Sequence, residues 1–274
     1  MKRICISAAL VCGMVCTALV SCGSSGKNTA PVEQPVIEIQ QIEIPDLPQN
    51  GLARADFTQS DEPYTPKYFG ADWIYDESEK PQLSWTEYRS EAGASIVFDE
   101  YGRFRKFTND TRLLYNTDVE TVLSADELNA AAREMLPLFC RDMAGFEETY
   151  VMNQDVNGMS YPCEIYMERK TTDQIKDSLM ISLNADGTIR TVSAEYCDLA
   201  AGTDLNAIDR AFANYIQTYK SNLSEGRVIS GETAELYQQI AGTAYGMYEF
   251  YIETPTGNPS EFTSTKKTVL IRAS

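Results

Sequence analysis

The spacing of hydrophobic and polar residues changes several times along this chain, and it predicts two helices among many strands. Ser124 and Glu127 form a capping box, in which each side chain binds a free backbone amide of the other residue. Apolar residues then recur every three or four positions, on one face of a helix: Leu128, Ala131, Met135, Leu138 and Phe139. Pro137 lies late in this pattern, so we expect the helix to kink or end near it.

A second helical pattern begins at Thr203 or Asp204, either of which can cap a helix. Its apolar positions repeat with the same spacing: Leu205, Ile208, Phe212, Tyr215, Ile216 and Tyr219. We interpret the apolar stripes of both helices as faces that pack against a core.

Elsewhere the apolar spacing shortens to two, which is typical of strands with one buried face. The pair Asn157-Gly158 suits a tight hairpin turn, and Gly102 and Gly187 suit turns that need a positive φ. The predicted strands are Ala94–Asp99, Arg103–Thr108, Thr149–Gln154, Met159–Arg169, Ser178–Asn184, Thr188–Cys197, Tyr245–Thr254 and Lys266–Arg272.

Short segments recur 77 to 85 residues apart, which suggests two copies of one unit. Leu128-Asn129-Ala130 recurs as Leu205-Asn206-Ala207, and Ile96–Phe107 recurs as Ile181–Val192. Gly158–Tyr161 recurs as Gly242–Tyr245. The sequence therefore predicts an α+β fold: two tandem units of one helix packed on an antiparallel sheet, preceded by a partial β unit.

The first 22 residues have the pattern of a secretory signal. Lys2 and Arg3 precede 17 uncharged residues, and the segment ends in Leu19-Val20-Ser21-Cys22. The alternative is an uncleaved membrane helix, for which 17 residues is the lower limit. The segment resembles the lipobox of bacterial lipoproteins. That resemblance implies that residues 1–21 are removed and that Cys22 carries the lipid (such as palmitate). The protein is then anchored at the extracytoplasmic face of the cell membrane, or of the outer membrane in a Gram-negative cell.

A second resemblance concerns the predicted strands and turns. Val156-Asn157-Gly158-Met159, followed by Ile181–Ile189, is similar to the central segment of PepSY and PepSY-like domains of bacterial envelope proteins. The similarity covers about residues 88–274 and implies a helix cradled by a curved sheet, with non-catalytic roles such as peptidase inhibition. The expected organisation is a signal peptide (1–21), a flexible tether (22–62), an aromatic-rich front section with a hairpin (63–121) and PepSY-like units (122–197 and 198–274).

Composition narrows the function. The chain of 274 residues has a formal charge of −17, and of −19 once Lys2 and Arg3 are removed, so it repels nucleic acid. It contains no histidine, which excludes Ser-His-Asp triads and His-ligated zinc. No catalytic motif or cofactor motif is present, and we predict neither an enzyme nor a cofactor.

Three groups of residues are candidates for sites. Aromatic residues crowd positions 64–88 and either form core or stack on a ligand, with Trp73, Tyr75 and Trp85 as the stacking candidates. A loop that resembles a calcium site contains Asn153, Asp155, Asn157 and Glu164, but predicted strands flank it, and we expect no metal there. Cys140, Cys163 and Cys197 are an odd set without close spacing, which predicts buried thiols. If the strand 161–169 pairs with Ser178–Asn184, Cys163 and Cys197 fall toward opposite ends of the strands, and this register predicts no Cys163–Cys197 disulfide.

These observations predict a membrane-anchored, extracytoplasmic lipoprotein that acts as a non-catalytic binding or regulatory module, either restraining a peptidase, as the PepSY-like resemblance implies, or sensing a ligand. Its partners would be the membrane, through the lipid on Cys22, and an envelope peptidase or cell-wall component. The alternatives are a polysaccharide-binding protein that uses exposed aromatic residues, and a hydrolase that uses two converging carboxylates without histidine.

Overall fold

The computed structural model describes residues 37–62, 64, 84–109, 113–153, 155–156, 159–160, 162–256 and 261–273. All of them belong to one unit, Val32–Ser274. Within these ranges, no helix combines the length and the apolar character needed to cross a bilayer.

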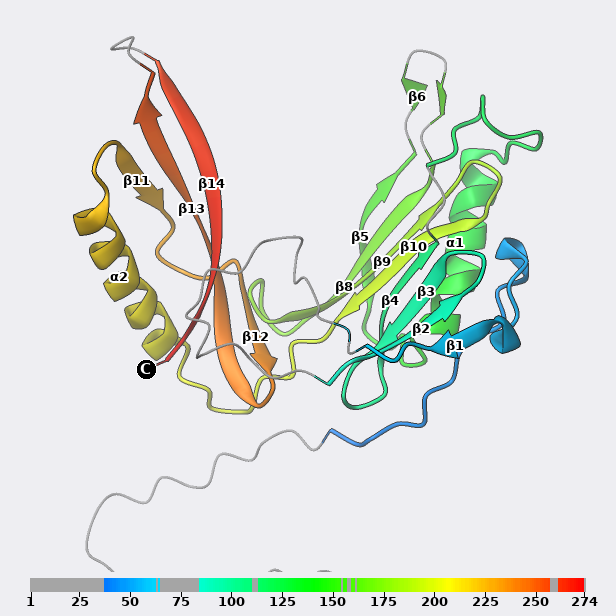
Figure 1. The fold of residues 1–274 in the computed structure, drawn as a ribbon, viewed down its shortest axis with the longest axis horizontal. Helices are drawn as coiled ribbons and strands as arrows, with labels where there is room; N and C mark the ends of the chain where they lie inside the picture. Colours follow the sequence, from blue (N-terminus) through cyan, green and yellow to red (C-terminus); the bar gives the residue numbers. More distant parts are fainter. Residues whose placement is uncertain are drawn as a thin grey trace, which may run out of the picture. The chain divides into compact units, whose positions relative to one another are not determined.

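The larger sheet has eight antiparallel strands in the order β1-β2-β3-β4-β10-β9-β8-β5 (Figure 1). Two short 3-10 helices, η1 (Pro48–Asn50) and η2 (Arg54–Asp56), precede it. Its strands are β1 (Phe57–Gln59), β2 (Thr86–Ser90), β3 (Ala94–Phe98), β4 (Phe104–Asn109), β5 (Glu147–Met152), β8 (Glu164–Lys170), β9 (Lys176–Leu183) and β10 (Ile189–Glu195).

The smaller sheet has four strands built around the long strand β13. Strand β14 pairs with one edge of β13, while β11 and β12 pair with the other edge. Its strands are β11 (Arg227–Ser230), β12 (Leu236–Ile240), β13 (Thr243–Pro255) and β14 (Phe262–Arg272). A separate two-stranded hairpin contains β6 (Asp155–Val156) and β7 (Met159–Ser160).

Helix α1 (Ala125–Phe139) packs on the larger sheet, and its predicted capping box is confirmed. The backbone amide of Glu127 donates to Ser124 Oγ at 3.3 Å, and the amide of Ser124 donates to the Glu127 carboxylate at 2.8 Å. The helix continues only two residues beyond Pro137. Leu138, which we expected in the apolar stripe, is 45% exposed, whereas Leu136 is buried.

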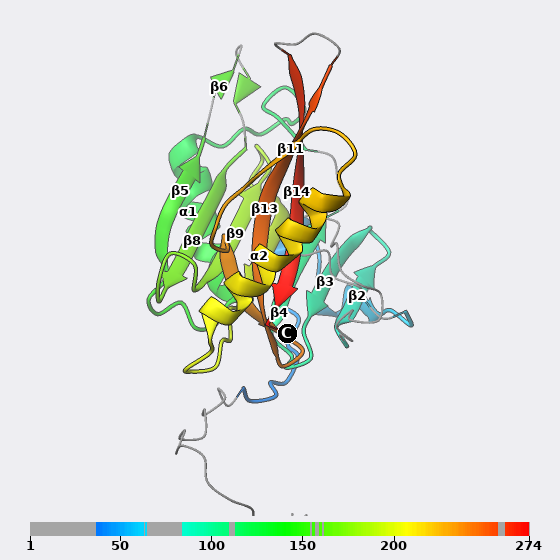
Figure 2. The same ribbon diagram turned by 90° about the vertical axis from the view of Figure 1, so that its left-hand side faces the viewer.

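Helix α2 (Leu205–Asn222) begins after Asp204, one of the two predicted caps, whose carboxylate accepts a hydrogen bond from the amide of Ala207 at 3.0 Å. It lies across strands β13 and β14 of the smaller sheet (Figure 2). The Phe212 ring stacks on Tyr248 with 3.9 Å between centroids. The buried residues of the helix are Ile208, Phe212 and Ile216.

The predicted fold class is wrong: the chain is mostly β, with an eight-stranded and a four-stranded sheet and two helices among the described residues, not two helix-on-sheet units after a partial unit. The prediction failed because the free edge of β4, in the front section, pairs with β10 of the first expected unit. Thr108 pairs with Thr191 and Lys106 with Ser193, which joins the front section to the strands of the first expected unit. The repeated segments around Gly102 and Gly187 are neighbouring hairpins of this one sheet.

Residues 37–46 form an extended segment, here called the strap, within the range that the sequence predicted as a tether. The partly buried side chains of Ile42 and Ile44 pack against the core. Leu47, which follows the strap, is fully buried. The amide of Gln40 donates to the carbonyl of Tyr101 at 2.7 Å. The strap therefore contacts the domain through Gln40, Ile42 and Ile44, although Ile39 is 84% exposed. Cys22 lies outside the described residues.

Candidate functional site

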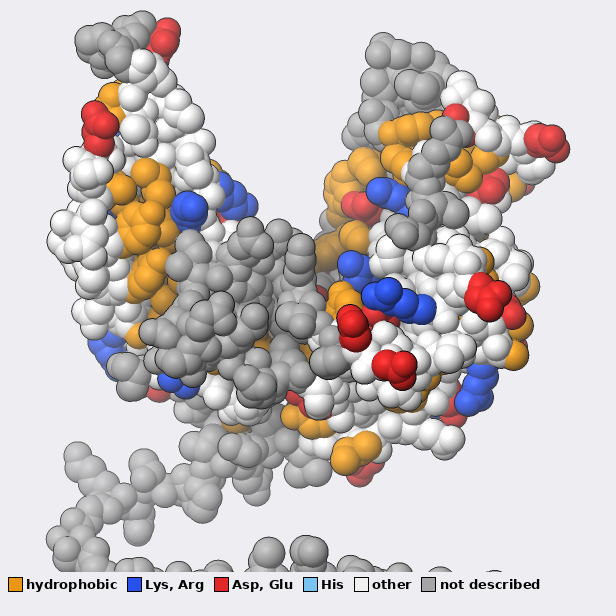
Figure 3. Space-filling view, in the orientation of Figure 1, with side chains coloured by type: hydrophobic (Ala, Val, Ile, Leu, Met, Phe, Trp, Pro, Cys, Tyr) orange, Lys and Arg blue, Asp and Glu red, His pale blue; other side chains and the backbone are white. Residues whose placement is uncertain are grey.

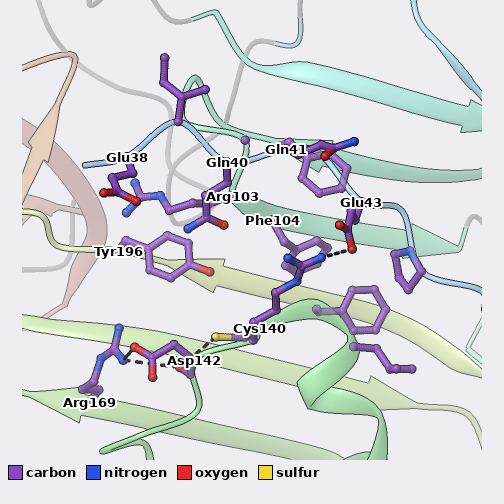
Figure 4. A pocket seen from close by; sticks show the side chains of 17 residues that line it. Glu38, Gln40, Gln41, Glu43, Arg103, Phe104, Cys140, Asp142, Arg169 and Tyr196 are labelled. Atoms are coloured by element: carbon purple, nitrogen blue, oxygen red, sulfur yellow. Dashed lines mark hydrogen bonds and ion pairs between the residues drawn. The ribbon is translucent and has the colours of Figure 1, made fainter. Parts of the chain in front are cut away.

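A pocket of about 510 Å³ lies beneath the strap (Figure 4). It is built by the strap, the β3–β4 hairpin, the end of α1 with the residues that follow, and the ends of β8 and β10. The turn of the β3–β4 hairpin lies very close to the strap. A Cβ atom added to Gly102 would be only 2.3 Å from the carbonyl oxygen of Gln40. Only glycine allows this approach at the observed φ of +78°.

The apolar side of the pocket is a cluster of three phenylalanines. Phe104 lies between Phe139 of α1, with 4.8 Å between ring centroids, and Phe98 of β3, at 6.3 Å. All three are at most 5% exposed. This aromatic packing fixes the end of α1 against the hairpin and so positions the polar residues around the pocket.

Arg103 is bound by two carboxylates. Its Nη1 and Nη2 donate to the two oxygens of Asp198 at 2.8 and 2.6 Å, and its Nε donates to Asp99 at 2.9 Å. Asp99 is fully buried and also accepts from Arg105 Nε at 2.9 Å. Burial lowers the pKa of Arg103, but its bonds to Asp198 and Asp99 outweigh that effect and raise the pKa above its ordinary value. The guanidinium therefore stays charged and paired.

The other two arginines of the pocket are paired in the same way. Arg169 donates to Asp142 and to Asp177, each at 2.8 Å, and Arg141 forms an ion pair with Glu43 of the strap. The hydrogen bond from Arg169 holds the pKa of the Asp142 carboxyl below its ordinary value. In the right-hand part of the face drawn in Figure 3, basic and acidic side chains likewise lie beside one another. Each of the three pocket guanidinium groups therefore already has a carboxylate partner.

Cys140 and Tyr196 are the potential nucleophiles of the pocket. Burial raises the pKa of the Cys140 thiol, and burial also raises the pKa of the Tyr196 phenol. The guanidinium carbons of Arg103 and Arg105 lie 4.4 and 4.8 Å from the centroid of the Tyr196 ring. Both groups are thus protonated at neutral pH, and a protonated thiol is a poor nucleophile.

The aromatic candidates do not form an exposed platform among the described residues. Trp85 is 6% exposed, and it packs with Val97 of the larger sheet and with Ile240 and Tyr245 of the smaller one. Its indole Nε1 donates to Glu100 at 2.7 Å. Trp85 therefore helps to join the two sheets and presents no open face to a sugar. Trp73 and Tyr75 lie outside the described residues.

The residues of the calcium-like loop are only partly described. Asn153 follows β5 and Glu164 begins β8, whereas Asn157 and the side chain of Asp155 lie outside the description. Across the ranges that are described, no three Cys, Asp or Glu side chains are grouped as metal ligands.

The three cysteines outside the signal region are free and buried. The carbonyl of Cys163 accepts from the amide of Leu183, and the amide of Cys197 donates to Asp177. These contacts lie at opposite ends of β9, as the predicted strand register requires.

The sequence did not reveal this pocket. Its arginines and carboxylates are dispersed, and Arg103 and Asp198 are 95 residues apart. The one local signal is the turn that contains Asp99 and Gly102, in which the Asp99 carboxylate accepts from the amides of Tyr101 and Arg103. Comparisons of the chain with protein-family models, with curated proteins and with solved structures gave no match.

Proposed function

We propose that this chain is a lipid-anchored, extracytoplasmic protein that acts as a non-catalytic binding or regulatory module. The anchor would be Cys22, on the pattern of the first 22 residues. The resemblance to PepSY-like domains adds an envelope peptidase as the partner that this module would restrain.

The observation that carries the non-catalytic role is the charge pairing in the pocket. All three of its guanidinium groups bind carboxylates, and burial keeps its thiol and its phenol protonated. A catalytic carboxylic acid needs a raised pKa, whereas the pKa of Asp142 is lowered. Burial does raise the pKa of Glu195, but this carboxyl accepts from Arg105 and is not among the residues that line the pocket. These features favour a structural role for the polar residues over the hydrolase alternative. The burial of Trp85 likewise weakens the polysaccharide alternative.

Alkylation of Cys140 tests the non-catalytic role. In the Cys163→Ala/Cys197→Ala variant, iodoacetamide should modify Cys140 more slowly than glutathione at pH 7, and the rate should rise only in alkaline solution. The matched variant is Cys140→Ala/Cys197→Ala. It keeps Cys163 and so reports the behaviour of a buried thiol outside the pocket. A Cys140 thiolate that forms below pH 7 would contradict the proposal, because it would be an activated nucleophile.

Labelling with an alkyne analogue of palmitate in a bacterial host tests the anchor. The wild-type protein should take up the label and sediment with membranes, and Cys22→Ala should do neither. Cys16→Ala is the matched control, because it removes a cysteine from inside the apolar segment and should leave labelling unchanged. Equal labelling of Cys22→Ala and wild type would refute lipidation at Cys22.

A further inference from the structure

Strand β5 forms one edge of the eight-stranded sheet, and its outer side has no strand partner among the described residues. Residues 147–151 are all exposed, and Tyr150 and Val151 expose 48% and 39% of their surface. The outer edge of such a strand presents unpaired backbone N–H and C=O groups.

The other sheet edges are shorter or protected. Strand β1 has three residues and β11 has four. Backbone amides of β12 donate outside its sheet, from Tyr237 to Gln174 at 2.9 Å and from Gln239 to Cys197 at 2.8 Å. Strand β14 carries Lys266 and Lys267. Strand β5 has neither lysine nor proline, the residues that usually prevent pairing at an edge.

The side chains of β5 present apolar and acidic groups together. Tyr150 lies opposite Tyr166 on one face of the sheet, and Val151 lies opposite Ile165 on the face that α1 covers. Glu147 and Glu148 extend the strand at its start. Glu148 binds Arg133 of α1 at 2.5 and 3.0 Å, which ties β5 to the helix. An added strand would therefore meet an edge with two exposed apolar side chains, the carboxylate of Glu147, and a Glu148 carboxylate that Arg133 already binds.

Charge identifies the kind of segment that fits. Pairing β5 with a second copy would bring together two chains of formal charge −17, each with two glutamates on the joining strand. We propose that β5 binds an extended segment of a partner protein, in which basic and apolar residues alternate, as a ninth strand of the sheet. This inference rests on the proposed binding function and specifies its site and the chemistry of its partner.

A synthetic peptide tests strand addition directly. The probe is a fluorescein-labelled peptide of four Lys-Val repeats, titrated with the lipidated protein in detergent micelles and followed by fluorescence anisotropy. Two further peptides are N-methylated, one at every valine and one at every lysine. Amides of alternate residues point to opposite edges of a strand, so one methylated peptide should bind about tenfold more weakly, while the other stays within about threefold of the parent.

Protein variants locate the site. Val151→Lys should weaken binding about tenfold, because it places a cation at the edge where the basic peptide lies. Thr265→Lys is the matched control: it adds the same charge to an exposed, β-branched position of β14 and should leave Kd within about twofold.

Three results would overturn the inference: no binding below about 1 mM, equal binding of both methylated peptides, or equal effects of the two lysine variants. A dimer that Val151→Lys dissociates would also overturn it, because a second copy would then occupy the edge. The tests of Cys22 and Cys140 do not involve β5, so the proposed function can hold even when strand addition fails.

Discussion

Replacing Gly102 by alanine should detach the strap, and the structure allows the size of the effect to be worked out. Gly102 has φ +78°, a conformation that costs an L-residue about 1–2 kcal/mol. The new Cβ would also lie 2.3 Å from the carbonyl oxygen of Gln40, so the strap must move. Its movement breaks the hydrogen bond from Gln40 to Tyr101, which contributes about 0.5–1.5 kcal/mol. We therefore expect a loss of about 1.5–3.5 kcal/mol in the free energy of unfolding.

Gly242→Ala separates the two contributions. Gly242 has φ +80°, and a Cβ there would meet no atom within 4 Å, so the variant measures the cost of the backbone conformation alone. Urea denaturation of the two variants should differ by about 1 kcal/mol. Glutamyl endopeptidase should cut the strap at Glu38 and Glu43 faster in Gly102→Ala than in Gly242→Ala. Equal stabilities and equal cleavage rates would refute the contact between strap and hairpin.

The remaining predictions concern stability. Ser124→Ala should lower the free energy of unfolding by about 1 kcal/mol, measured by urea denaturation, because α1 loses its cap. Asp209→Ala should lower the free energy of unfolding by about 2–4 kcal/mol, since the hydroxyls of Tyr237 and Tyr248 both donate to this carboxylate and would lose their acceptor. In the Tyr237→Phe/Tyr248→Phe background, the same change should cost far less. Burial raises the pKa of Glu168, but hydrogen bonds from two lysines outweigh this and lower the pKa overall. Glu168 thus stabilises the fold above its unfolded pKa of about 4.3, and the stability gap between wild type and Glu168→Gln in urea melts should shrink as pH falls below that value; a gap that grows in acid would contradict the assignment.

The sequence by itself determined the helix caps and the tight turns. The capping box at Ser124, the cap at Asp204 and the turns at Gly102 and Gly187 all occur where the pattern predicts them. Each depends on residues within four or five positions of one another, so the chain before folding already carries the information. Alternation of apolar residues in the same way indicated the segments of β3, β4, β5, β8, β9, β10, β13 and β14, but it did not predict β1, β2, β11 or β12.

Tertiary structure decided which strands are neighbours. An alternating pattern fixes the two faces of a strand but not the strand that pairs with its edge, and the pairing of β4 with β10 made one sheet out of two expected units. For the same reason, the sequence could not predict the ion pair between Arg103 and Asp198 or the backbone hydrogen bond from Gln40 to Tyr101. It also left open whether Trp85 is buried, because an aromatic side chain occurs both in cores, which we favoured, and on binding surfaces. These contacts join residues that only the folded chain brings together.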